Sequence, residues 1–135
     1  MVTIKAYTDL EQSKKLAEIL PIESADMHYS KDFDGSWFVD LAEYTSVKIP
    51  KYVGNIEEHL LPCWSLAALL GIIKKYGLID LRFLTSTFDG RGEHLTNVWC
   101  CTFDNINAVS FDIYADNPID TCYEAILKLK EKNLL

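Results

Sequence analysis

The spacing of hydrophobic positions changes along this chain, and each change marks a new element. The longest apolar run lies near the middle and contains Trp64, Leu66, Ala67, Leu69, Leu70, Ile72 and Ile73. It is shorter than the roughly 20 residues that cross a bilayer. Helix formers dominate it, Pro62 suits a first helical position, and Gly77 suits the residue after a helix end. We therefore predict a buried central helix that begins at Pro62, because the run lacks a wide polar face.

After this helix, hydrophobic residues recur at every second position, which is typical of strands with one buried face. The alternation covers residues 78–85, 94–103 and 109–114, and turn residues at 89–92 and 104–107 separate these segments. The apolar face would carry Leu81, Trp99, Cys101, Phe103, Phe111 and Ile113. The spacing predicts a three-stranded antiparallel meander.

Two further helices are predicted towards the ends of the chain. Thr8 and Glu11 have the spacing of a capping box, and Pro21 ends the helix that they begin. Asn117 suits the N-cap of the last helix, and Pro118 suits its first position. Both segments carry an apolar stripe and a charged side, as expected of helices at a protein surface.

Residues 22–61 have the weakest pattern, with short strands predicted at 36–41 and 45–49. Together with the other elements they predict an α+β fold in a single domain of residues 1–135. Its antiparallel sheet has three strands, or five if the short strands join it, and packs against three helices with the central one buried.

Composition and charge narrow the classes of partner. The chain has 135 residues, 49% of them hydrophobic, and a formal net charge of −7. No Lys/Arg cluster is present to neutralise phosphates, so direct nucleic-acid binding is not expected. The first residues lack the apolar segment of a signal peptide, so we expect a cytoplasmic protein without a membrane partner.

The acidic residues are unevenly distributed. Residues 22–43 contain one base, Lys31, and six acids, Glu23, Asp26, Asp32, Asp34, Asp40 and Glu43. This segment is either a solubilising surface or a patch that binds a basic partner, in the extreme case as a DNA mimic.

The four cysteines are expected to be reduced in the cytoplasm. No C-x-x-C pair occurs, and the three histidines do not have the spacing of zinc ligands. We expect no metal and no other cofactor.

Three stretches resemble a family of small proteins from gut anaerobic bacteria and their phages and mobile elements. They are residues 23–27, residues 61–70, and residues 116–120 leading into 126–129, and the block Pro62-Cys63-Trp64-Ser65-Leu66-Ala67-Ala68-Leu69-Leu70 is the most specific. The family has no known activity. The resemblance therefore implies a related fold and a mobile-element setting, and it brings no catalytic residues.

Cys63 is the one residue that suggests catalysis. A thiol in the first turn of a helix has a lowered pKa, and the order Cys63, His94, Asp112 resembles that of papain-like thiol hydrolases. The strand alternation opposes this alternative, because His94 and Asp112 fall on the face away from the central helix. A cysteine among apolar residues is more often a small core residue.

The first hypothesis is instead a non-enzymatic protein that binds another protein. Aromatic residues in the segment 22–61 would contribute to its surface, and so would apolar residues on the outer face of the sheet, where the helices do not cover them. The candidate binding residues are Trp37, Phe38, Tyr44, Leu84, Val98 and Tyr114. A homodimer through this outer face or through a strand edge is a further hypothesis.

Overall fold

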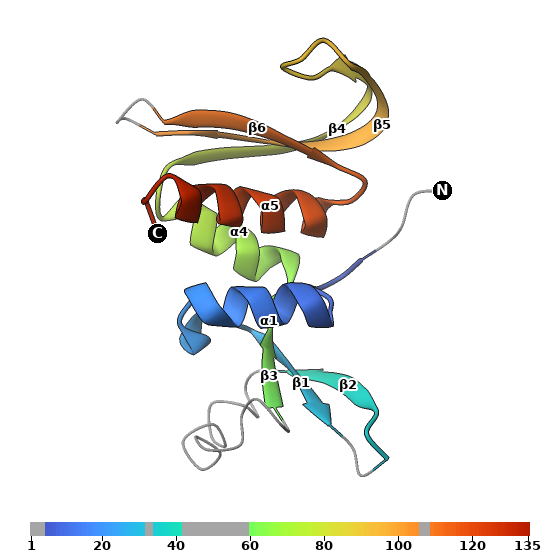
Figure 1. Ribbon diagram of the computed structural model, residues 1–135, viewed down its shortest axis with the longest axis vertical. Coiled ribbons are helices and arrows are strands. Elements are labelled where there is room, and N and C mark those ends of the chain that lie inside the picture. Colours follow the sequence, from blue (N-terminus) through green and yellow to red (C-terminus); the bar gives the residue numbers. More distant parts are fainter. Residues whose placement is uncertain (1–4, 32–33, 42–59, 106–108) are drawn as a thin grey trace. The chain divides into compact units, whose positions relative to one another are not determined.

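The computed structural model describes residues 5–31, 34–41, 60–105 and 109–135 (Figure 1). It contains α-helices and two three-stranded antiparallel sheets, which confirms the predicted α+β class. The chain divides into two compact units, one of residues 7–68 and the other of residues 1–6 and 69–135. That residues 1–135 form a single domain stays a prediction. Within the described ranges, no helix is both long and apolar enough to cross a membrane.

The first helix of the unit 7–68, α1 (Leu10–Ile19), has its N-cap one residue later than predicted. The Asp9 carboxylate accepts the backbone N–H of Gln12 at 2.8 Å, and the Gln12 side chain accepts the N–H of Asp9 at 3.1 Å. The predicted capping box of Thr8 and Glu11 is therefore wrong. Thr8 is a poorer candidate here because its hydroxyl already accepts the N–H of Trp64 at 3.1 Å.

Three short strands form the sheet of this unit, in the order β2-β1-β3. They are β1 (Met27–Lys31), β2 (Trp37–Leu41) and β3 (Leu60–Cys63), and a single turn of 3-10 helix at Ile22–Ser24 precedes them. β2 confirms the strand predicted at residues 36–41, whereas the strand predicted at 45–49 lies outside the described residues. These strands form a second sheet and do not extend the meander.

The central strand β1 was not predicted. His28 and Tyr29 are consecutive and both are buried, so both faces of the strand are covered. A strand that is covered on both faces lacks the alternation by which half-buried strands are recognised.

The predicted start of the central helix at Pro62 is wrong. Residues 60–63 pair with β1, with Cys63 opposite Met27. β3 lies at an edge of its sheet, where proline is tolerated because no ladder hydrogen bond needs its missing N–H. A short apolar run is compatible with either a buried strand or a buried helix, and here it is divided between the two.

The helix α4 (Leu66–Lys74) follows after two residues. The Ser65 hydroxyl accepts the N–H of Ala68 at 3.2 Å, which is the hydrogen bond of an N-cap. Leu69, Ile72 and Ile73 are buried, and the exposed side is made of small or charged residues, Ala67, Gly71 and Lys74.

The unit that contains residues 69–135 has the predicted meander, β4 (Leu78–Phe88), β5 (His94–Asp104) and β6 (Ser110–Ala115), in the order β4-β5-β6. The last helix, α5 (Pro118–Glu131), contacts β5 and β6 (Figure 1). Asn117 is its N-cap as predicted, and its side chain accepts the N–H of Asp120 at 2.9 Å. The buried side of α5 consists of Ile119, Thr121, Cys122, Ala125, Ile126 and Leu129.

The long β4–β5 hairpin bends strongly, and its tip curves back over the face of the sheet that α5 does not cover (Figure 1). Within this hairpin Asn97 has a φ of 53°, and the ladder pairing is interrupted there, between Leu84–Val98 and Ser86–Thr96. Asparagine is among the few residues that adopt this left-handed conformation readily.

Candidate functional site

Cys63 lies in a closed network of hydroxyl groups within the unit 7–68. Its thiol donates to the carbonyl oxygen of Thr8 at 3.5 Å, and the Thr8 hydroxyl lies 3.7 Å from its sulfur. Tyr29 donates to the same carbonyl oxygen at 2.8 Å, and the Ser13 hydroxyl lies 2.8 Å from that of Thr8. All four side chains are buried. The network holds β1, β3 and the start of α1 together.

This environment makes Cys63 a poor nucleophile. It ends a strand and does not lie in the first turn of a helix, so the expected lowering of its pKa by a helix dipole is wrong. Burial instead raises the pKa of the thiol, because removal from water disfavours the thiolate. A buried neutral thiol has neither the charge state nor the access that thiol chemistry requires.

The two other residues of the hydrolase alternative have different partners. His94 and Asp112 belong to the unit that contains residues 69–135, whereas Cys63 belongs to the unit 7–68. The His94 ring lies 2.7 Å from the Ser86 hydroxyl, and Asp112 accepts the Thr102 hydroxyl at 2.8 Å. In the ladder, His94 pairs with Phe88 at the tip of the hairpin, and Asp112 pairs with Thr102 eight positions further along β5. The two side chains do not form a dyad.

The aromatic candidates of β2 have different environments. Trp37 is half-buried against the cluster of Tyr29, Leu61 and Cys63, and the Lys31 ammonium lies 5.6 Å from the centre of its ring. Phe38 is 48% exposed. Tyr44 lies outside the described residues. Of the two described residues, Phe38 is the more exposed.

The candidates on the outer sheet face are brought together, but the bent hairpin shelters them. Leu84 lies opposite Val98, and Tyr114 lies opposite Cys100 on the next strand pair. Val98 is buried and Leu84 and Tyr114 are half-buried. Burial raises the pKa of the Tyr114 hydroxyl, and Thr87 of the hairpin is among the side chains near it. These three residues are therefore less accessible to a partner than the sequence predicted.

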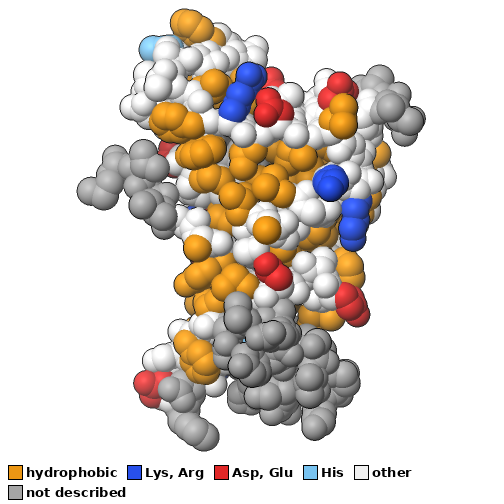
Figure 2. All heavy atoms as spheres, turned by 180° about the vertical axis from the view of Figure 1, so that it is seen from behind, with side chains coloured by type: hydrophobic (Ala, Val, Ile, Leu, Met, Phe, Trp, Pro, Cys, Tyr) orange, Lys and Arg blue, Asp and Glu red, His pale blue; other side chains and the backbone are white. Residues whose placement is uncertain are grey.

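The exposed apolar side chains are concentrated on β4. Four large hydrophobic side chains are exposed in the described part of the chain, and three of them belong to this strand: Leu78 (78% exposed), Phe83 (43%) and Phe88 (64%). Hydrophobic side chains are also visible on the face of the molecule that Figure 2 shows. Sequence reasoning missed Phe83 and Phe88. The signal was present, because β4 is the first strand of a predicted meander and hence an edge.

The two exposed phenylalanines have aromatic neighbours. Phe83 meets Trp99 edge to face, with ring centroids 5.5 Å apart, and Phe88 lies 5.0 Å from the ring of His94. Rings held in this way lose little side-chain freedom when a partner covers them, a property of aromatic anchors at protein interfaces.

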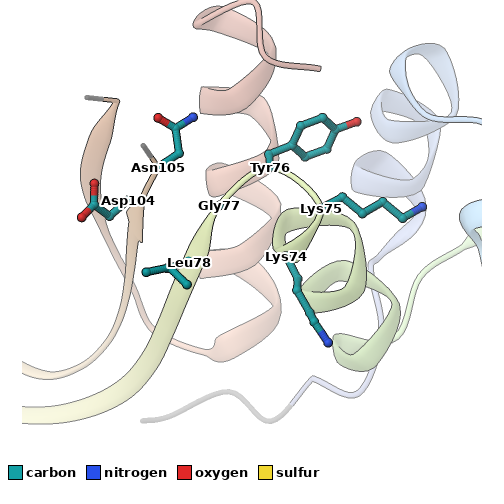
Figure 3. Close-up of a pocket in the computed structure, with 7 residues that line it drawn as sticks. All are labelled: Lys74, Lys75, Tyr76, Gly77, Leu78, Asp104 and Asn105. Atoms are coloured by element: carbon teal, nitrogen blue, oxygen red, sulfur yellow. The ribbon is translucent and has the colours of Figure 1, made fainter. Parts of the chain in front are cut away.

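An open hollow of about 510 Å³ lies between the end of α4 and the start of β4. Figure 3 shows that the side chains around it diverge. Lys74 and Lys75 point away from each other, and Asp104 and Asn105 point away from both. A ligand site requires polar groups that converge on one place, so this hollow is not a candidate.

No protein-family model matches the chain, and no curated protein or solved structure matches it either.

Proposed function

We propose that this protein is a non-enzymatic protein-interaction protein that works inside the cell together with a mobile element or its host. The observation that carries the proposal is the position of Leu78, Phe83 and Phe88 on one edge strand. Large apolar side chains that stay exposed along an edge strand favour contact with another macromolecule. The mobile-element setting is supported by the resemblance of residues 62–70 to that family.

Two acidic residues of the segment 22–43 have structural roles, which favours aromatic contact and not charge as the basis of binding. Asp26 accepts the N–H of Ser65 at 2.9 Å and also its hydroxyl, and Asp34 accepts the N–H of Ser36 at 2.9 Å. The hydrogen bonds from Ser36 lower the pKa of Asp34. Two carboxylates of the segment thus satisfy backbone groups at a helix start and a turn, a structural use that needs no basic partner.

The state of Cys63 further supports a non-enzymatic role. The thiol is fully buried and its pKa is raised by burial, so at neutral pH it is protonated and shielded from substrates.

Site-specific photo-crosslinking in native lysate tests the proposal. A photoreactive phenylalanine analogue replaces Phe88 in one variant and Phe38 in a matched control, since both rings are exposed but lie in different units. We expect a discrete crosslinked species from position 88 that disappears when Phe83 is also changed to Ser. The same adducts from both positions, or none from position 88, would contradict binding of another protein at the exposed rings of β4.

A further inference from the structure

The outer edge of β4 has no strand beside it in the described part of the chain, where the sheet order is β4-β5-β6. Its first seven residues, Leu78–Leu84, form an unbroken ladder with β5, from Leu78–Asp104 to Leu84–Val98. An unpaired strand edge offers a row of backbone N–H and C=O groups to another strand. Folded proteins usually block such edges. The side chains of residues 78–84 determine which strand can pair with this one.

We propose that this edge pairs antiparallel with β4 of a second copy of the chain, about a two-fold axis at Leu81. Pairing across such an axis joins the two three-stranded sheets into one sheet of six strands. A two-fold interface of this kind uses the same surface on both copies, so the segment must be complementary to itself.

The charges of the segment satisfy that requirement. Asp80 and Arg82 flank Leu81, and both are well exposed, with their charged groups 3.8 Å apart within one chain. With the axis at Leu81, each Asp80 lies opposite Arg82 of the second copy. Directly opposed side chains on neighbouring strands approach to about 4.5–5.5 Å between Cβ atoms, and opposite charges there are stabilising.

The apolar residues match in the same register. Leu78 lies opposite Leu84 of the second copy, on the face that also carries the two charge pairs. Ile79 lies opposite Phe83 on the other face. Leu78 and Phe83 are two of the exposed hydrophobic side chains, so this pairing covers apolar surface that one chain leaves open to water.

The same charges disfavour the competing alignments. If one strand slides by two residues, either Asp80 lies opposite Asp80 or Arg82 lies opposite Arg82. An in-register parallel pairing would oppose both like pairs at once. Like charges directly opposite each other are destabilising, so the sequence selects one register.

The dimer rests on the proposed function of β4 as an interaction strand, but the two can fail separately. Phe88 lies beyond the paired segment, where it remains open to a different protein. A monomer that still gives the crosslink from position 88 would refute the dimer and leave the proposed function standing. A dimer that gives no crosslink from position 88 would support the pairing of β4 and refute the binding of another protein at Phe88.

Charge reversal tests the register. Sedimentation velocity of the full chain, from low to high micromolar concentration, should show a monomer–dimer equilibrium. Asp80→Arg and Arg82→Asp each convert two attractive pairs into two repulsive ones, and we expect each to raise the dimer dissociation constant roughly tenfold or more. The double variant Asp80→Arg/Arg82→Asp restores both pairs and should dimerise like the wild type. A mixture of the two single variants should form heterodimers.

Glu93→Arg and Arg91→Asp serve as matched controls, because both are exposed residues of the hairpin loop and change the net charge by the same amounts. Circular dichroism of each variant confirms that it is folded. A single-chain mass at every concentration would overturn the proposal and leave the edge open to a strand of another protein. A dimer that both single reversals leave unchanged would overturn it too, since that dimer would use another surface.

Discussion

Gly77 and Asp104 approach each other so closely that a Cβ atom on Gly77 would lie 2.5 Å from the carbonyl oxygen of Asp104. The same atom would lie 2.7 Å from the Phe103 ring, which is fully buried. Neither backbone nor a packed core ring can move aside cheaply. Between α4 and β4, position 77 therefore has no room for a side chain, and only glycine fits there.

We predict that Gly77→Ala destabilises the protein by about 1–3 kcal/mol, as overpacking in a core does. Gly71→Ala is its control. Gly71 lies on the exposed side of α4 with open space around it, and alanine there should add about 0.5–1 kcal/mol through helix propensity. Urea denaturation measures both. Equal effects of the two substitutions would show that steric conflict is not what matters at Gly77.

A second prediction concerns the carboxylate of Asp26, which binds the backbone N–H and the hydroxyl of Ser65 just before α4. Asp26→Ala leaves that N–H without its partner and frees the side chain that caps Ala68. Loss of a helix cap costs about 0.5–2 kcal/mol, and we expect a loss in that range. Thermal unfolding measures it.

Glu23→Ala is the control for Asp26, because Glu23 is an exposed acid of the same segment. It removes the same charge and should leave the unfolding temperature nearly unchanged. A double-mutant cycle of Asp26→Ala with Ser65→Ala should show coupling, since either substitution removes the same contact. Additive effects would contradict the assigned role of the pair.

Local signals predicted the second half of this fold well. The alternation of residues 78–85 and 94–103 and the Asn117-Pro118 cap each specify an element from a few neighbouring residues. The prediction for the Pro62 region was wrong because a short apolar run has the same pattern in a buried strand and in a buried helix. There the pairing of Cys63 with Met27, a contact between distant residues, decides for a strand.

The candidate surface was only partly predictable for a related reason. Alternation assigned Leu84, Val98 and Tyr114 to the outer face correctly. It could not show that the hairpin curves back over that face, because alternation specifies which face a residue is on and not how the strands bend. The exposed positions of Phe83 and Phe88 follow from the place of β4 at the edge of the sheet, which is a property of the assembled sheet.

A third prediction concerns thiol reactivity. All four cysteines are free and buried, with at most 1% of any residue exposed. In the native state, iodoacetamide at neutral pH should therefore label them far more slowly than the unfolded chain. Mass spectrometry of labelled peptides gives the rate at each cysteine. Labelling of Cys63 faster than a free thiol would overturn the closed network and revive the hydrolase alternative.

The last prediction is a loss of stability at alkaline pH. Burial raises the pKa of Cys63 above its ordinary value of 9.0 and that of Tyr29 above its ordinary value of 10.0. Above these values the unfolded chain releases protons that the folded chain retains, so the free energy of unfolding falls as pH rises. The slope reaches up to about 1.4 kcal/mol per pH unit for each such group.

Urea denaturation at a series of pH values, from 7 to above 9.0, measures how the free energy of unfolding depends on pH. Two substitutions then show which group causes the decline. Cys63→Ala removes one titrating group, so the decline above pH 9.0 should become shallower. Ser13→Ala removes a hydroxyl from the same buried network that does not titrate in this range. It should lower stability at every pH and leave the decline above pH 9.0 in place, because Cys63 still retains its proton in the folded chain. An identical decline in Cys63→Ala and the wild type would show that Cys63 does not remain protonated in the folded chain.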